Sequence, residues 1–211
     1  MAAPSWSDAI NVQPVALVAV GATLRATLNV QNKFGAKLFI RAMRLSASAP
    51  SNGLYVAVRR ILNGTPAGGA AGVDITHSKA LLALTDVTTA SSLTTLNGAP
   101  TIPGSTVTLT TAIGFAGNQH VGIVNSATTP TVIEFARTSK ISANTLTLDR
   151  PLTNTGLGTG NTITNNAFIL PPVTVEGTPG NAEIEVIFDN GLETTVAYAV
   201  EVWAQTLDSV A

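Results

Sequence analysis

Two stretches of the 211-residue chain alternate apolar and polar residues with a period of two. In GATLRATLNV (21–30) every second residue is apolar, and GNAEIEVIFDN (180–190) repeats the pattern. Successive side chains of a strand point to opposite faces of a sheet, so the alternation predicts long antiparallel strands with one wet face. Two such layers pack as a β-sandwich. We therefore expect an all-β fold.

The charged residues are divided unevenly along the chain. Residues 1–62 hold seven bases and one acid, residues 172–211 hold seven acids and no base, and residues 63–171 hold four of each sign. Opposite charge on two distant segments favours their pairing. We predict a jelly-roll-like β-sandwich from residues 14–62 and 172–211, with residues 63–171 inserted as a small β-barrel or sandwich. The alternative is that two surface faces differ in sign by chance.

Turn-forming residues divide the outer segments into further strands. NKFG (32–35) precedes a strand over 36–45, and a turn ending in SNG precedes a strand over 54–62. Asn190-Gly191 is a strong hairpin signal. We therefore expect the strand 180–190 to turn back into a return strand over 194–207.

The middle segment is expected to hold short strands between turns rich in Gly, Asn and Pro. Examples are STVTLTT (105–111), HVGIVN (120–125) and TVIEFARTSKI (131–141). DITHSKALLALTDV (74–87) is compatible with a short helix.

Residues 1–13 are predicted to form an N-terminal arm. Either this segment frays, or it orders on a neighbouring subunit with Trp6 as an anchor. The segment lacks the basic start and apolar run of a secretory signal, and no apolar run of the chain is long enough to cross a membrane as a helix. We therefore expect no membrane partner.

The chain lacks the residue patterns of common catalytic and metal sites. It has no Cys, and its two histidines, His77 and His120, have no carboxylate at ligand spacing. No Ser lies in a G-x-S-x-G elbow. GLGTG (156–160) lacks the Lys and the following helix of a phosphate loop, so we expect a hairpin loop there. The prediction is a protein that is not an enzyme, with no catalytic, cofactor-binding or metal residues.

Asp149 and Arg150 stand together near the end of TLTLDRPL and resemble a possible active-site pair. Neighbours on a strand face opposite sides of the sheet, so the two side chains are not expected to contact each other. We expect Asp149 to pair across a hairpin with Arg137 or Lys140, and Arg150 to pair with Glu134.

Nucleic-acid binding and carbohydrate binding are the two alternatives to a structural role. The basic residues are spread over alternating strand positions and aromatic residues make up 5% of the chain, so no nucleic-acid partner is expected. A carbohydrate-binding module stays open because Trp and Tyr side chains form sugar platforms. The candidate platform residues are Trp6, Tyr55, Tyr198 and Trp203, of which Tyr198 and Trp203 are expected in the core or in an interface.

Four stretches carry a resemblance to a known group. In chain order they are TLRATLNVQNKFGAKLFIRAMRL, LYVAVRRILNG, GFAGNQHVGIVNSATTPTVIEFARTSKISANTLTLDRPL, and AEIEVIFDNG followed by TTVAYAVEVWAQTLDS. Together they resemble tailed-bacteriophage virion proteins in which a small barrel splits a strand-rich outer domain. The resemblance covers about residues 14–208. This chain departs from the group in a run without charge from Val87 to Ile133.

The resemblance implies a non-enzymatic structural protein of the phage particle. The first expectation is a capsid decoration (cement) or minor capsid protein on the head surface. Its implied partners are the major capsid protein or other virion proteins and further copies of itself, for example as a trimer. The alternatives are a tail, neck or baseplate component, or a carbohydrate- or receptor-binding β-sandwich module.

Overall fold

The structure is a computed structural model, and its regular elements are all β-strands. It describes residues 5–30, 33–62, 79–85, 91–128, 131–169, 172–176 and 182–208. Within these ranges there are fifteen strands and no helix. This confirms the prediction of an all-β fold.

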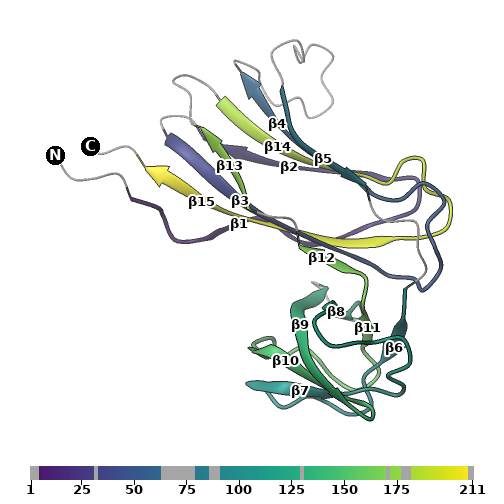
Figure 1. The fold of residues 1–211 in the computed structure, drawn as a ribbon. Helices are drawn as coiled ribbons and strands as arrows, with labels where there is room; N and C mark the ends of the chain where they lie inside the picture. The colour runs from purple at the N-terminus through teal and green to yellow at the C-terminus, as the bar shows by residue number, and fades with distance from the viewer. Residues whose placement is uncertain are drawn as a thin grey trace.

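Two antiparallel sheets face each other as a sandwich (Figure 1). In order, the first sheet consists of β1 (Ile10–Val18), β15 (Tyr198–Asp208), β3 (Lys33–Arg44) and then β12 (Ala167–Ile169) and β13 (Val173–Glu176). Both β12 and β13 pair with β3. In order, the second sheet consists of β2 (Thr23–Asn29), β14 (Ala182–Asp189), β4 (Tyr55–Leu62) and β5 (Lys79–Thr85). The orders β1-β15-β3-β12/β13 and β2-β14-β4-β5 correspond to the two sheets of a jelly roll. The jelly-roll-like sandwich is therefore confirmed.

The sandwich core lies between the two sheets. Leu38 and Ile40 of β3 belong to one buried cluster with Val56 and Val58 of β4 and Val186 of β14. These residues are two apart on their strands, so they share the inner face while their neighbours point outward. The period of two in the sequence therefore places the core.

Opposite charges meet across the strand pairs that join the two ends of the chain. Glu185 of β14 binds Arg25 of β2 at 3.0 Å and also binds Arg59 of β4. Lys33 of β3 lies 2.8 Å from Asp208 of β15. The basic N-terminal and acidic C-terminal segments thus share one sandwich, and their charges pair between neighbouring strands.

The third sheet curls into a small barrel. In order, its strands are β6 (Leu93–Thr95), β11 (Thr162–Thr164), β8 (His120–Asn125), β9 (Val132–Ser142), β10 (Thr145–Leu152) and β7 (Gly104–Thr108). Hydrogen bonds from Asn97 N to Thr108 O (2.8 Å) and from Thr110 N to Thr95 O (2.9 Å) join its two edges. A separate buried cluster that includes Leu109, Ile123 and Leu146 forms its core.

The Asn190-Gly191 hairpin prediction is wrong. The strands on its two sides, β14 and β15, belong to different sheets. The Asn190 side chain is buried and its Nδ2 donates to Ala19 O (2.9 Å) and Val196 O (3.0 Å). These tertiary contacts hold the segment as a crossing from one sheet to the other, so they override its local turn preference.

The short helix expected over 74–87 is also contradicted. Residues 79–85 form β5, which pairs with β4 from Tyr55↔Thr85 to Arg60↔Lys79. The backbone bonds to β4 outweigh the weak helical pattern of this segment. The rest of the expected helix, 74–78 and 86–87, lies outside the described residues. Because β5 and β12 pair with the sandwich, the strands that pair only within the barrel run from β6 to β11.

The segment predicted as an arm lies along the last strand of its own chain. Trp6 forms a bridge with Leu207, and Ser7 N donates to Thr206 O at 2.8 Å. Ile10 then starts β1 opposite Ala204. The start of β1 and the end of β15 therefore lie at one end of the sandwich, away from the barrel (Figure 1).

Candidate functional site

The barrel packs on the outer face of the first sheet through an apolar cluster. Its buried members are Met43, Ala167 and Ala199 from the sandwich and Val124, Ile133 and Phe135 from the barrel. At Gly122 of β8 a Cβ would overlap the Met43 sulfur, so the Met43 side chain packs directly against the β8 backbone there. The two bodies therefore meet in a packed interface.

Hydrogen bonds at the two chain connections reinforce this interface. Arg44, at the end of β3, is 1% exposed, and its backbone N donates to Asn166 O at 3.1 Å. With the Asn166 side-chain oxygen turned toward it, Arg44 Nε and Nη2 donate at 2.8 and 2.9 Å. Ser92 N donates to Asn165 Oδ1 at 2.8 Å. The segment that enters the barrel, at Ser92, is thus bonded to the segment that leaves it, at Asn165. The leaving segment is in turn bonded to the end of β3 through Asn166.

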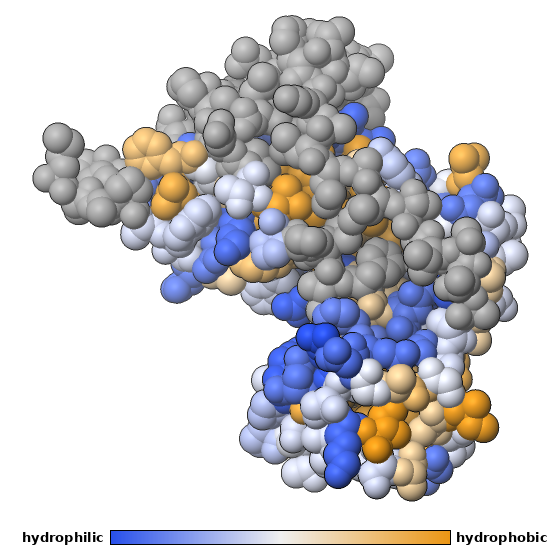
Figure 2. Space-filling model, in the orientation of Figure 1, coloured by the Kyte–Doolittle hydropathy of each residue, from blue (hydrophilic) through white to orange (hydrophobic). Residues whose placement is uncertain are grey.

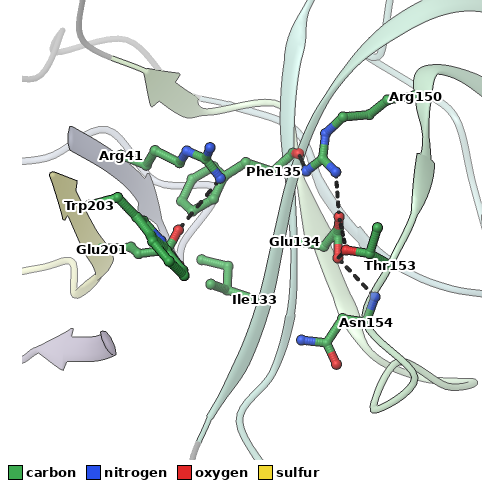
Figure 3. Close-up of a pocket in the computed structure, with 9 residues that line it drawn as sticks. All are labelled: Arg41, Ile133, Glu134, Phe135, Arg150, Thr153, Asn154, Glu201 and Trp203. Carbon is green, nitrogen blue, oxygen red and sulfur yellow. Dashed lines mark hydrogen bonds and ion pairs between the residues drawn. The ribbon is translucent and has the colours of Figure 1, made fainter. Parts of the chain in front are cut away.

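A cleft of about 310 Å³ opens beside this interface (Figure 3). Its sandwich wall is formed by Arg41, Glu201 and Trp203, and its barrel wall by Ile133, Glu134, Phe135, Arg150, Thr153 and Asn154. Figure 2 shows hydrophilic residues gathered where the two bodies meet. The cleft is the candidate functional site because pockets between two packed bodies are common ligand sites.

The barrel wall is held by a hydrogen-bond network centred on Glu134. Glu134 is 5% exposed, and its carboxylate lies 2.8 Å from Arg150 Nη1 and accepts from Asn154 N at 3.2 Å and Thr153 Oγ1 at 3.4 Å. Arg150 Nη2 also donates to the Phe135 carbonyl. The predicted pairing of Arg150 with Glu134 is confirmed. This wall is preorganised because each of its ionic groups has several partners.

Asp149 faces away from this network, as the alternation of the strand requires. It accepts from Arg137 at 3.0 Å, through the backbone N of Arg137 and not through the guanidinium. The Arg137 side chain turns instead to Asn118 O at 3.4 Å. A register shift between Thr147 and Leu148 brings the Asp149 carboxylate to the β9 backbone. Asp149 and Arg150 therefore act separately, with only Arg150 at the cleft.

The sandwich wall is less fully paired than the barrel wall. Arg41 of β3 and Glu201 of β15 are direct cross-strand neighbours, and Arg41 Nη1 lies 3.6 Å from Glu201 Oε2, beyond hydrogen-bond range. The Arg41 Nε is buried without a hydrogen-bond partner. The guanidinium also lies 5.8 Å from the centroid of the Phe135 ring, a cation–π contact that spans the cleft.

Trp203 lies outside the core, which was one of the two places expected for it; an interface remains the other. Tyr198 is fully buried, as expected, but Trp203 is half-buried on the outer face of β15 and lines the cleft. Val202 and Ala204 point into the core, so Trp203 between them must point outward. Its cross-strand partner is Phe39, which is also half-buried. The alternation of the strand was therefore the signal that could have placed Trp203.

The other candidate platform residues lie far from the cleft in the fold. Trp6 is 45% exposed beside the end of β15, and Tyr55 is 41% exposed at the start of β4. His120 is exposed at the start of β8. Among the described residues no group of three His, Cys, Asp or Glu side chains is arranged to hold a metal ion. His77 lies outside the described residues.

The GLGTG segment is a loop, but it is not a hairpin. It connects β10 to β11, which are not neighbours in the barrel. Its amides bond within the protein: Gly156 N to Asn154 Oδ1 (3.1 Å), Gly158 N to Asn161 Oδ1 (2.6 Å) and Gly160 N to Leu96 O (2.9 Å). These donors are already used, so the loop offers no free cradle for a phosphate.

A buried carboxylate outside the cleft, Glu193, was not predicted from the sequence. Glu193 is 1% exposed and accepts from Ser51 N (3.0 Å), Asn52 N (2.8 Å) and Gly53 N (2.7 Å). It also accepts from Thr195 N at 2.8 Å. One side chain thereby joins the loop before β4 to the crossing between β14 and β15. Its partners come from two distant segments, so no local motif reveals them.

These hydrogen bonds set the ionisation of Glu193. Burial raises the pKa of the Glu193 carboxyl, but the bonds from Thr195, Asn52, Gly53 and Ser51 outweigh burial and lower the pKa far below 4.5. The carboxylate is therefore charged at neutral pH. Its arrangement is structural because backbone amides already occupy its oxygens.

Comparison of the chain with protein-family models, with curated proteins and with solved structures found no match. Within the part of the chain that the structure describes, no helix is long and apolar enough to cross a membrane.

Proposed function

We propose that this protein is a non-enzymatic structural component of a tailed-phage particle. In this role it is a capsid decoration protein that binds the outer surface of the head and stabilises it. Such a protein acts by burying surface across neighbouring subunits, and the symmetry of the head multiplies each contact. The sequence resemblance to virion proteins and the jelly roll with its inserted barrel support the proposal.

The observation that carries the proposal is the exposure of large apolar side chains at both ends of the sandwich. Trp6 (45%), Ile10 (44%) and Phe34 (52%) lie at the end where β1 and β3 begin and β15 finishes. Val20 (46%) and Leu192 (80%) lie at the opposite end. Figure 2 shows hydrophobic residues at these extremities. Clustered exposure of this kind is typical of surfaces that contact other proteins.

The low charge of the chain fits the same role. Only 11% of residues are charged, and the net charge is −1. Such a chain brings few ions that must be desolvated when it packs against capsid subunits. It would self-associate readily as a free monomer, which fits a protein that works in an assembly.

Copy number on purified particles tests this proposal. Heads lacking tails and complete particles of the phage that encodes the chain would be purified, and the protein quantified by mass spectrometry against the major capsid protein. We expect hundreds of copies on both. A handful of copies found only with tailed particles would instead support a tail, neck or baseplate component.

A further inference from the structure

We propose that the cleft between the sandwich and the barrel binds a neutral carbohydrate unit. The inference rests on the side chains of the cleft and is independent of the location of the protein on a particle. It assigns a ligand class to the site defined by Arg41, Glu201 and Trp203 on one wall and Glu134, Arg150 on the other.

The charges of the cleft favour a neutral ligand. Its lining holds two arginines and two glutamates, and each arginine is close to one glutamate: Arg150 to Glu134 at 2.8 Å and Arg41 to Glu201 at 3.6 Å. An anion would meet two buried carboxylates, and a cation would meet two guanidinium groups. A polyhydroxylated neutral ring meets both donors and acceptors, and each hydroxyl can use either kind.

The sandwich wall has hydrogen-bonding capacity left for a ligand. The Arg41 Nη1–Glu201 Oε2 contact is too long for a hydrogen bond, and the Arg41 side chain is 34% exposed, so its terminal guanidinium nitrogens can donate to a ligand in the cleft. Polar groups held in a buried site without full pairing are stabilised when a ligand hydroxyl completes their bonds. On the opposite wall the Glu134 carboxylate already has Arg150, Thr153 and Asn154 as partners, so it serves as a fixed surface.

Trp203 supplies the apolar part of the site. It is half-buried, stands next to Glu201 on the sheet side of the cleft, and has Phe39 as its cross-strand neighbour (Figure 3). A pyranose ring has an apolar face of C–H groups that stacks on an indole while its hydroxyls reach polar neighbours. The cleft volume of about 310 Å³ lies at the small end of ligand pockets and suits one or two sugar rings.

The two tryptophans of the chain provide a test with an internal control. In the ¹⁵N-labelled wild-type protein, the indole N–H signals of Trp203 and Trp6 would be assigned with a Trp6→Phe variant. The probes are methyl glucoside, methyl galactoside, methyl mannoside and N-acetylglucosamine. We expect at least one of them to shift the Trp203 signal saturably while the Trp6 signal stays in place.

Charged and acyclic probes define the ligand class. Inorganic phosphate and N-acetylneuraminic acid carry negative charge, and glycerol has hydroxyls without a ring. None of the three is expected to shift the Trp203 signal saturably. A shift caused only by the anions, or an equal shift with glycerol, would overturn the assignment to a neutral sugar.

A substitution on the sandwich wall connects the signal to the proposed contacts. Glu201→Gln is expected to weaken the binding of the responding sugar by about tenfold with an unchanged far-ultraviolet spectrum. Asp149→Asn, on the strand of Arg150 but facing away from the cleft, is the matched control and is expected to bind as the wild type does. The wild-type titration decides the proposal even if Glu201→Gln fails to fold: no movement of Trp203 with any of the four sugars rejects it.

Discussion

At the scale of single residues, Glu193 joins two distant segments of the sandwich. Its carboxylate accepts eight hydrogen bonds, from Ser51, Asn52, Gly53, Thr194, Thr195 and Val196. Replacing Glu193 by Gln removes the negative charge that these donors stabilise. We expect Glu193→Gln to lower the free energy of unfolding by about 3 kcal/mol, measured by urea denaturation. Asp149→Asn, an exposed carboxylate, is the control and is expected to change it by less than about 1 kcal/mol. Equal effects of the two substitutions would contradict a special role for Glu193.

Glu193 also makes stability depend on pH in a defined direction. Its pKa in the folded protein is lowered below the ordinary value near 4.5. The unfolded chain therefore takes up a proton first as the pH falls, and the stability that Glu193 contributes is present above about pH 4.5 and is lost below it. We expect the unfolding temperature of the wild type to fall more steeply between pH 6 and pH 3 than that of Glu193→Gln. Parallel curves would show that Glu193 is not linked to the acid response.

At the scale of elements, the close approach of β8 to β3 fixes the barrel on the sandwich. A methyl group at Gly122 would overlap the sulfur of Met43, which is fully buried, so Gly122→Ala forces the Met43 side chain or β8 to shift. We expect a loss of about 1–3 kcal/mol in the free energy of unfolding. Gly158→Ala is the matched control because a Cβ there meets no atom within 4 Å. Wild-type stability in Gly122→Ala would mean that the interface adapts to the added methyl group.

The elements also show how far local sequence determines this fold. The alternation in residues 21–30 and 180–190 predicted β2 and β14, because a half-buried strand needs that period. The partner of a strand is not encoded locally: Asn190-Gly191 has a hairpin signal, yet β14 and β15 lie in different sheets. In the same way, β5 is a strand only because β4 supplies an edge for it.

The candidate site was predictable only in part, for the same reason. Glu134 and Arg150 lie on adjacent strands joined by a short turn, so their pairing followed from strand alternation. The opposite wall comes from β3 and β15, which are distant in the sequence and paired with each other. This wall lies opposite the barrel because the sandwich and the barrel pack together. The local sequence around Arg41 or Trp203 does not specify that packing.

At the scale of the whole molecule, the barrel has its own core and its own edge closure. We expect residues 91–165, expressed alone, to fold, because all six strands and the edge bonds Asn97–Thr108 and Thr110–Thr95 lie within this range. Dispersed amide signals in NMR and a β-type circular dichroism spectrum would check this. The isolated barrel should be less stable than the intact protein because Val124, Ile133 and Phe135 lose their cover. A disordered spectrum would mean that the barrel requires the sandwich.

The end of the sandwich that carries Trp6 gives a second prediction at this scale. If the protein decorates heads, Trp6→Ala removes a large apolar side chain from a proposed contact while sparing the β1 pairing that starts at Ile10. We expect lower occupancy on purified heads, by about tenfold in affinity, measured by co-sedimentation. Trp203→Phe, in the cleft, is the comparison variant and should leave occupancy unchanged. Full occupancy with Trp6→Ala would exclude this end as the contact.

The pairing of the chain ends also orders the events of synthesis. β1 and β2 are made before the barrel and their partners β14 and β15 after it, so the sandwich cannot close until the barrel and both partner strands have left the ribosome. The barrel strands end at Thr164, before either partner exists. The inserted barrel can thus fold while the host domain is still open, and β1 and β2 wait as unpaired edges that are prone to aggregate. The rate at which the protein matures is therefore set by its longest-range strand pairs, and a folded barrel shortens the loop that these pairs must close.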